Sequence, residues 1–182
     1  MNQNNFVKTN IDGVQILFEN TIADGRGTFF DLVKNGFPKN IYKGGVKHIY
    51  ASLSKTKLMA RGNHFHFENF ENFYTLTGTA LWVLLDCREN SSTYGNVFSF
   101  ITSYEDYKGG ETQVYSVKNN EFAHFTVPPK VYHLVAPLTD EPVLVVALGS
   151  TPFKEKDVGK PKKELMKNIN PIILKFGITI KN

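Results

Sequence analysis

Short runs of alternating apolar and polar residues recur between residues 14 and 148, separated by glycine, asparagine and aspartate. Alternation with a period of two places every second side chain on the same face of a β-strand, so we expect a chain built mainly of short strands. Many short strands at this spacing are typical of a β-sandwich or barrel, here a single all-β, antiparallel jelly roll. The predicted strands are residues 14–18, 28–33, 48–53, 61–66, 72–77, 80–86, 95–101, 112–117, 121–127 and 142–148.

The C-terminal end departs from this pattern. Residues 162–168 lie between Pro161 and Pro171, which leaves room for a helix of at most two turns. Residues 172–180 predict one more strand, placed to join the sheet of a partner. We therefore divide the chain into a domain at residues 1–153 and a short C-terminal extension at residues 154–182.

The positive charge is concentrated in this extension. The whole chain of 182 residues has a formal net charge of +4. The extension holds eight lysines against three acidic residues, and the remaining 13 basic against 14 acidic residues leave residues 1–153 at −1. A nucleic-acid-binding domain has a basic stripe on its folded body, so we expect no nucleic-acid partner and interpret the lysines as a solvated surface.

Composition adds three limits. Aromatic residues make up 13% of the chain, which favours strands. The single cysteine, Cys87, excludes an internal disulfide framework and fits a cytoplasmic location. No secretory signal is visible at residues 1–10, and no apolar stretch of eighteen residues predicts a membrane span.

One segment concentrates residues that ligate metals. His64 and His66 project from the same face of a predicted strand, and Glu71 follows five residues later. His133, in a segment that reads Pro-Pro-Lys-Val-Tyr-His, can complete a cage of three histidines and one carboxylate. Imidazole and carboxylate ligands suit zinc, iron, manganese or nickel. The spacing HxH-x4-E-x6-G is the first cupin motif and PxxxxH is a degraded second one, so the jelly roll is expected to be a cupin double-stranded β-helix. The alternative is a metal-free pocket in which the same histidines act as acid and base.

Other segments carry a resemblance to known families. Residues 24–31, Asp-Gly-Arg-Gly-Thr-Phe-Phe-Asp, resemble the DxRGxFFE segment of the RmlC-like cupin superfamily of dTDP-4-dehydrorhamnose 3,5-epimerases. Residues 77–95 are similar to a second segment of that family. Residues 26–34 and 62–78 are more similar still to the zinc-binding C-terminal cupin domain of bifunctional capsular-polysaccharide reductase/epimerases. Together the resemblance covers residues 20–155.

The resemblance implies an epimerase that acts on a nucleotide-linked 4-keto-6-deoxy sugar, at C3 or at both C3 and C5, in surface-polysaccharide biosynthesis. A ketone at C4 acidifies the hydrogens at C3 and C5, so a base can form an enolate that is reprotonated from the opposite face. A divalent metal, zinc being favoured, would stabilise the enolate, and no nicotinamide cofactor is needed. By resemblance, the metal ligands are His64, His66, Glu71 and His133.

The resemblance also implies substrate-binding residues. Arg26 and Arg61 match arginines that contact the substrate phosphates, which suits the fork of a guanidinium group. Phe29 and Asp31 match residues that contact the nucleotide base, often across a subunit interface. A homodimer is therefore expected, and the apolar residues 172–174 would also be covered in it.

Three departures from the family leave the acid and base open. Residues 150–153 read Ser-Thr-Pro-Phe where the 3,5-epimerases have a catalytic tyrosine. Glu71 or Asn72 stands in place of the family's lysine near the substrate. Lys130 replaces the glycine of the second cupin motif. His64 matches the catalytic histidine of the metal-free epimerases. The other catalytic candidates are His48 and Tyr132, together with Tyr74 and Lys47. Tyr132 adjoins a predicted ligand and is expected to point the other way.

Three other functions remain open at this point. A 3,4-ketoisomerase shares the enolisation step, a non-catalytic cupin could bind the sugar nucleotide, and a dioxygenase could use the same ligands for iron.

Overall fold

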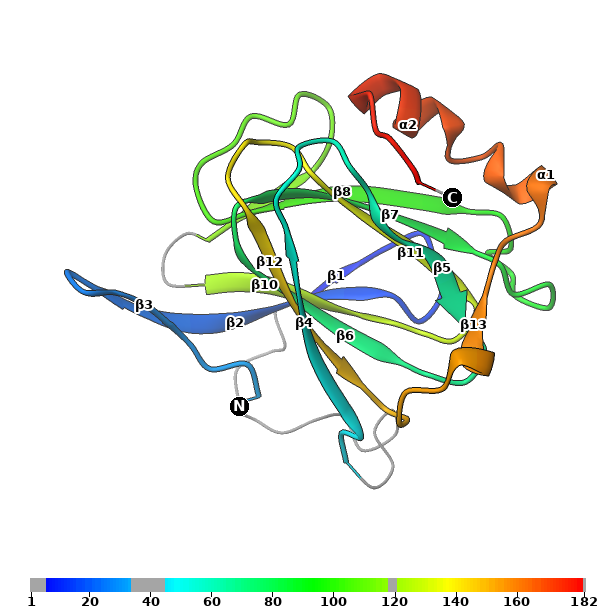
Figure 1. Ribbon diagram of the computed structural model, residues 1–182, viewed down its shortest axis with the longest axis horizontal. Coiled ribbons are helices and arrows are strands. Elements are labelled where there is room, and N and C mark those ends of the chain that lie inside the picture. Colours follow the sequence, from blue (N-terminus) through cyan, green and yellow to red (C-terminus); the bar gives the residue numbers. More distant parts are fainter. Residues whose placement is uncertain (1–5, 34–44, 118–120, 182) are drawn as a thin grey trace.

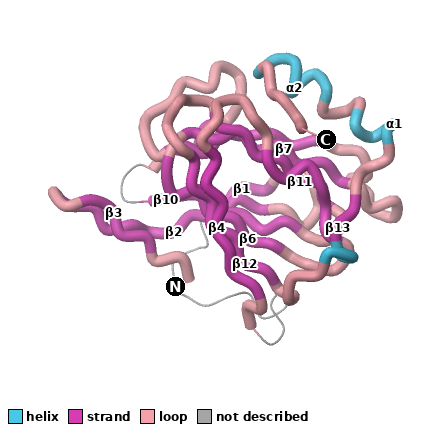
Figure 2. The backbone as a smooth tube through the Cα atoms, viewed as in Figure 1, coloured by secondary structure: helices cyan, strands magenta, loops and turns pink. Residues whose placement is uncertain are grey.

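The computed structural model describes residues 6–33, 45–117 and 121–181. Figures 1 and 2 show a structure composed mainly of strands, with short helices near its C-terminal end that include the 3-10 helix η1 (Glu155–Asp157). The strands are β1 (Phe6–Lys8), β2 (Gln15–Asp24), β3 (Gly27–Phe30), β4 (His48–Ser54), β5 (Arg61–His66), β6 (Glu71–Thr77), β7 (Thr79–Asp86), β8 (Val97–Ser103), β9 (Val114–Ser116), β10 (Glu121–Val127), β11 (Val131–Pro137), β12 (Val143–Gly149) and β13 (Val158–Gly159).

Two sheets face one another. The seven-stranded sheet has the order β1-β2-β10-β6-β12-β4, with β3 paired to β2, and the six-stranded sheet has the order β13-β5-β11-β7-β8-β9. Every pair is antiparallel except β8 with β9. This arrangement confirms the predicted all-β jelly roll.

The space between the sheets is filled by aromatic side chains. Trp82 is 1% exposed and packs against Phe73 and Phe125, with ring centroids at 5.0 and 4.8 Å. The indole nitrogen of Trp82 donates to the hydroxyls of Thr75 and Thr102, so its polar atom is satisfied in the apolar interior. Each fully buried side chain of this kind contributes roughly 1.5–3 kcal/mol by leaving water.

The C-terminal extension covers the outer face of the six-stranded sheet. Leu165, Ile169 and Ile178 pack there against residues of β7 and β11, in the region where Figure 1 shows helices α1 (Lys163–Met166) and α2 (Asn170–Phe176). The predicted short helix before Pro171 is confirmed. No helix among the described residues is long and apolar enough to cross a membrane.

The predicted strand at residues 172–180 is wrong, because residues 170–176 form α2. Pro171 occupies the first turn, where its missing N–H leaves no hydrogen bond unmade, so it starts this helix rather than blocking it. Gly177, with φ 66°, ends the helix in the left-handed conformation that favours glycine. Ile172 and Ile173 are half-buried and pack against the same cluster, whereas Leu174 is 80% exposed.

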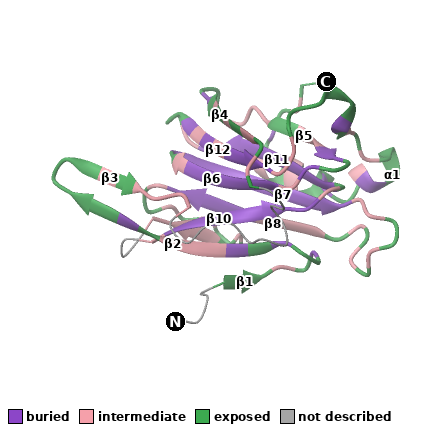
Figure 3. Ribbon diagram, turned by 90° about the horizontal axis from the view of Figure 1, so that it is seen from below, coloured by how far each residue is buried: buried purple, intermediate pink, exposed green. Residues whose placement is uncertain are grey.

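An arm extends from the other sheet. Residues 16–20 of β2 pair with β10, whereas residues 21–24 pair only with β3. Figures 1 and 3 show the β2–β3 hairpin projecting from the body, with most of its surface exposed. Phe29 and Ile22 are 61% and 67% exposed on it.

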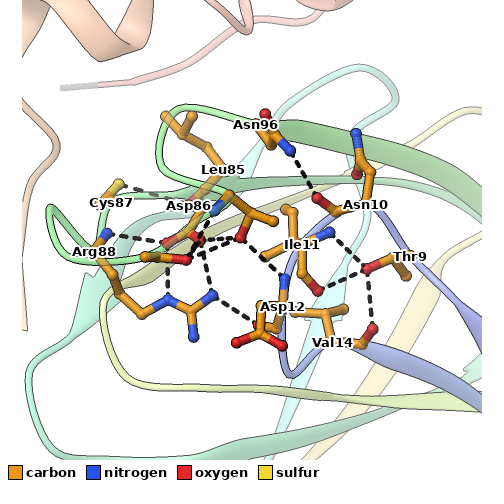
Figure 4. A network of polar contacts seen from close by, with 12 residues as sticks. Thr9, Asn10, Ile11, Asp12, Val14, Leu85, Asp86, Cys87, Arg88 and Asn96 are labelled. Carbon is orange, nitrogen blue, oxygen red and sulfur yellow. Dashed lines mark hydrogen bonds and ion pairs between the residues drawn. The ribbon is translucent and has the colours of Figure 1, made fainter.

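A polar network ties the N-terminal segment to the end of β7 (Figure 4). The fully buried Asp86 accepts hydrogen bonds from Arg88, Ser91 and Thr93. Arg88 also donates to the carbonyl oxygen of Asp12 at 2.7 Å. Burial alone raises the pKa of Asp86, but these donors hold it at about 2, so the carboxylate is ionised and satisfied.

Candidate active site

Three strands bring the predicted ligand residues together. His64 and His66 alternate along β5 and therefore face the same side of the sheet. His133 lies on β11, where its Cα pairs directly with that of His64. Glu71 begins β6 in the facing sheet. The four side chains therefore meet between the two sheets.

The four ligand atoms converge within 4.8 Å of one another. His64 Nε2 lies 3.3 Å from His66 Nε2. Glu71 Oε2 lies 3.2 Å from His66 Nε2 and 3.4 Å from His133 Nε2. Glu71, His66 and His133 are buried, and His64 is half-buried.

A bulge in β5 directs His64 into this cluster. Gly62 and Asn63 both have positive φ, 80° and 60°, and the register of β5 with β11 shifts beside His133. A Cβ atom on Gly62 would lie only 2.8 Å from the carbonyl oxygen of His133, so no larger residue fits. The carbonyl of Gly62 lies 2.9 Å from His64 Nδ1 and can accept its proton. This contact leaves Nε2 as the lone-pair nitrogen that faces the cluster.

Two further side chains orient the ligands from outside. Asp157 Oδ2 lies 3.2 Å from His66 Nδ1. The hydroxyl of Tyr50 donates to Glu71 Oε1 at 2.9 Å. Metal-binding histidines and carboxylates commonly have such outer partners, which fix the tautomer of the imidazole and the direction of the carboxylate.

The residues fit a divalent metal. Glu71 Oε2 is buried without a well-aligned hydrogen-bond donor among the described residues, and it faces the Nε2 atoms of His66 and His133. Three imidazole nitrogens and one carboxylate oxygen form a donor set that suits zinc and similar ions. A cation between these atoms would satisfy the carboxylate oxygen and use the lone pairs of the nitrogens.

The protonation states of Glu71, His64 and His133 agree with that fit, whereas the acidic neighbours of His66 favour its protonated form. Burial raises the pKa of Glu71, but its contacts with His66, His133 and Tyr50 outweigh burial and hold it at about 2. Burial lowers the pKa of His133 to about 3 and also lowers that of His64. Burial acts in the same direction on His66, but Glu71 and Asp157 leave its pKa raised. An ionised carboxylate and neutral imidazoles are the forms that bind metal.

Two cavities adjoin the cluster. One, the His48 cavity, has a volume of about 250 Å³ and is lined by His48, Asn69, Phe153, Lys154 and ligand residues. The other, the Arg61 cavity, has a volume of about 230 Å³. Its lining residues include Arg61 and Ser52 together with the apolar side chains of Phe73, Trp82, Val135 and Val145. Tyr50 and His64 line both cavities, so the cluster is reached from two sides.

The structure brings some of the other predicted residues to these cavities. Arg61, which is exposed, lines the Arg61 cavity beside His64. His48 lines the His48 cavity, where its ring lies 5.1 Å from that of Tyr50 and 5.9 Å from that of Phe153. Lys47 lines neither cavity.

Tyr132 and Tyr74 are directed elsewhere. The hydroxyl of Tyr132 donates to Asn63 Oδ1, and its ring packs in the apolar cluster beneath the C-terminal extension. The hydroxyl of Tyr74 donates to the carbonyl of Leu32. The alternation of side chains along β11 and β6 explains both placements, as expected for Tyr132.

Arg26, Phe29 and Asp31 do not join the cluster within one chain. Arg26 and Phe29 line a separate hollow on the β2–β3 arm, and Arg26 pairs with Asp24. Asp31 is half-buried just after β3 and lines neither cavity beside the cluster.

The sequence analysis missed the roles of Tyr50 and Asp157. Tyr50 shares the inner face of β4 with His48, so strand alternation alone placed it near the cavity but did not indicate its contact with Glu71. Asp157 had no such signal, because it lies in the extension after the last predicted strand.

Comparisons with known proteins identify the family and the fold. Residues 8–148 match the family model of dTDP-4-dehydrorhamnose 3,5-epimerase. A search of curated proteins finds no match. The solved dTDP-4-dehydrorhamnose 3,5-epimerase from Elizabethkingia anophelis is similar over 88% of this chain and 81% of its own, with 19% identity and a TM-score of 0.64.

Two similar structures contain ligands. The enzyme from Bacillus anthracis, solved with TDP and pyrophosphate, matches over 90% of this chain and 88% of its own, with 18% identity and a TM-score of 0.65. The enzyme from Legionella pneumophila, in complex with dTDP-4-keto-L-rhamnose, matches over 86% of this chain and 76% of its own, with 20% identity and a TM-score of 0.64. At these identities the likeness shows a shared fold.

Proposed function

The chain belongs to the dTDP-4-dehydrorhamnose 3,5-epimerase family, and from this membership we propose that it epimerises a nucleotide-linked 4-keto-6-deoxy sugar at C3 by enolisation, at a metal centre. Isomerases of this family serve polysaccharide biosynthesis. A cytoplasmic location fits the single free thiol, Cys87.

The observation that carries the metal centre is the convergence of three imidazole nitrogens on the buried Glu71 Oε2. His64, His66, Glu71 and His133 would hold the ion. When bound, a divalent ion supplies Lewis acidity that polarises the ketone of a sugar and stabilises developing negative charge.

Proton transfer then depends on the residues of the His48 cavity. Enolisation requires a group that removes the proton next to the ketone and a group that returns one to the opposite face. His48 lines the cavity next to the cluster without belonging to it, and imidazole is the side chain most often used as a general acid and base. Phe153 lies at the mouth of this cavity, in the segment where the family has its catalytic tyrosine. The missing phenol supports reaction at C3 alone rather than at both C3 and C5.

Arg61 supports nucleotide binding on the other side. Its guanidinium lines the apolar Arg61 cavity, where it is placed to pair with a phosphate of a sugar nucleotide. The apolar residues behind it suit the methyl group of a 6-deoxy sugar.

The arm supports a homodimer. Arg26 and Phe29 are exposed on a hairpin that projects from the body, so a second copy of the chain would bring them to a cavity that they do not reach in their own chain. Ile49 and Leu53, on the outward face of the edge strand β4, are 66% and 48% exposed and provide an apolar surface for such contact.

Solvent exchange tests the reaction. The protein is incubated in D₂O with a dTDP-4-keto-6-deoxyglucose substrate, and the product is analysed by NMR. Deuterium at C3 alone, with the ketone still at C4, is the expected result. Deuterium at both C3 and C5 would show two-centre epimerisation, and a ketone moved to C3 would show a 3,4-ketoisomerase. Binding without any exchange would indicate a non-catalytic cupin.

Metal content tests the centre. Elemental analysis of the wild type should find about one ion per chain, as four converging ligands predict. His64→Ala and His133→Ala should lose it, whereas His124→Ala, which alters a histidine outside the cluster, should keep it. A metal-free wild type that resists loading with zinc would leave His64 and His66 as acid and base groups.

A further inference from the structure

The C-terminal extension returns to the ligand cluster. Val158 and Gly159 of β13 pair with His66 and Phe65 of β5. The backbone carbonyl of Asp157 accepts a hydrogen bond from the amide of Phe67 at 2.9 Å. The segment of the extension around Asp157 therefore lies at the edge of the six-stranded sheet, next to β5, which carries two of the candidate ligands.

Asp157 links this edge to one ligand. Its side chain is 7% exposed, and Oδ1 accepts a hydrogen bond from the amide of Glu68 at 2.7 Å. Its other oxygen, Oδ2, lies 3.2 Å from His66 Nδ1. The carboxylate is thus held by the backbone just after β5 and lies within ion-pair distance of the outer nitrogen of His66, which has no well-aligned hydrogen-bond partner among the described residues.

The two contacts have a consequence for metal binding. A carboxylate at Nδ1 keeps the imidazole proton on that nitrogen and directs the Nε2 lone pair towards Glu71 and the other histidines. If the extension undocks from β5, His66 loses this partner and its ring is free to change tautomer and rotamer. The docked extension is therefore the state with the better-organised ligand set.

We propose that docking of the C-terminal extension and ion binding at the cluster are thermodynamically coupled, with Asp157 as the positioning residue that couples them through His66. The inference rests on the proposed metal centre. It gives the extension, which follows the part of the chain matched by the family model, a role in the site.

The size of the coupling can be bounded. Loss of an outer partner of a ligand commonly lowers metal affinity about 10- to 100-fold. Linkage is reciprocal, so a bound ion should favour the docked extension by a similar factor. Leu165 and Ile169 anchor the helical part to the six-stranded sheet independently of the cluster, so the coupled motion is confined to the residues around Asp157.

Zinc affinity is the first test. Zinc is titrated against a chromogenic chelator into the full-length wild type, Asp157→Asn and Glu155→Gln. Glu155 is an exposed carboxylate of η1, the 3-10 helix that also contains Asp157, and serves as the matched control. Asp157→Asn should bind zinc about 10- to 100-fold more weakly, and Glu155→Gln should match the wild type.

Two additional measurements separate positioning from loss of structure. The visible spectrum of the cobalt-loaded protein should shift in Asp157→Asn, because the His66 ring is less constrained, while the fluorescence of the buried Trp82 stays unchanged. Trypsin should cleave after Lys154 and Lys156 at least about tenfold more slowly when zinc is added to the wild type. Zinc should protect Asp157→Asn much less. Cleavage after Lys108, in the exposed loop between β8 and β9, should not respond to zinc.

The outcomes distinguish the two proposals. A wild type that binds no zinc or cobalt would overturn the metal centre and the coupling with it. Zinc that binds Asp157→Asn as tightly as Glu155→Gln would overturn the coupling alone, as would trypsin cleavage after Lys154 and Lys156 that zinc does not slow.

Discussion

The hydroxyl of Tyr50 donates a hydrogen bond to Glu71 Oε1 at 2.9 Å, which leaves Oε2 as the carboxylate oxygen that faces the three histidine nitrogens. Tyr50 comes from the edge strand β4, and Glu71 begins β6, two strands away in the same sheet. The pair therefore determines which oxygen of Glu71 is presented to an ion.

Replacing Tyr50 by phenylalanine should loosen this arrangement. The variant leaves Glu71 Oε1 buried without its donor, which costs about 1–3 kcal/mol of unfolding free energy in the metal-free protein. Zinc affinity should fall roughly tenfold or more, because the carboxylate is no longer oriented. Denaturant unfolding and zinc titration measure the two effects. Tyr115→Phe removes a phenolic hydroxyl beside the same core and should leave zinc affinity unchanged. Equal zinc affinity in the two variants would contradict the orienting role of Tyr50.

Gly62 should tolerate no side chain. A Cβ there meets the carbonyl oxygen of His133 at 2.8 Å, and its φ of 80° is unfavourable for other residues. Gly62→Ala should therefore lower the free energy of unfolding by more than about 1 kcal/mol and displace His64 from the cluster. Gly25→Ala is the control, because a Cβ added at Gly25 has no neighbour within 4 Å. This variant should change the free energy of unfolding by less than about 0.5 kcal/mol. Similar thermal midpoints for the two variants would show that the bulge adapts.

Replacing Lys130 by glycine should stabilise the protein. Lys130 stands where the second cupin motif has glycine, and its φ of 59° explains that preference. The left-handed conformation costs a non-glycine residue about 1–2 kcal/mol. A glycine avoids this cost but loses more conformational entropy on folding, which offsets part of the gain in stability. Lys130→Gly should raise the free energy of unfolding by up to about 1 kcal/mol, whereas Lys57→Gly should lower it. A destabilised Lys130→Gly would mean that the lysine side chain contributes more than the strain costs.

His124 should make stability depend on pH. Burial lowers the pKa of His124 to about 4, below its unfolded value of 6.5. The unfolded chain therefore binds more protons between these values, so this residue's contribution to stability is full above pH 6.5 and is lost as the pH falls towards 4. The loss amounts to at most about 3 kcal/mol. Other histidines also titrate, so the measurement compares urea unfolding of the wild type with His124→Gln, whose pH dependence should be shallower. Parallel curves would show that folding does not shift the pKa of His124.

The fold could be predicted from the sequence because strand signals are local. Alternation placed most strands within a few residues, and the same alternation put His64 and His66 on one face. Helix α2 was not predicted, because a proline in the first turn of a helix and a proline that ends one look alike in a sequence.

The candidate site was predictable only as far as its ligands. Alternation along one strand indicated that His64 and His66 share a face, and the cupin motif spacings added Glu71 and His133. The contacts of Tyr50 with Glu71 and of Asp157 with His66 join residues 21 and 91 positions apart on separate elements. Such contacts depend on sheet order and on the path of the extension, and neither leaves a local pattern.

Mixed dimers should show whether the arm acts on a partner's site. Arg26 lies on the projecting arm and His64 lies in the cluster, so if the arm serves the other subunit, Arg26→Ala of one chain and His64→Ala of its partner damage the same site of a mixed dimer. One site of such a dimer then keeps both residues. Each variant alone should be nearly inactive, and an equal mixture after subunit exchange should recover about a quarter of wild-type turnover, because half of the dimers are mixed and each has one intact site. A mixture of Arg61→Ala with His64→Ala is the matched control, because both residues line one cavity of the same chain, and it should recover nothing. No recovery in the first mixture, with dimers confirmed by light scattering, would show that Arg26 does not act across the interface.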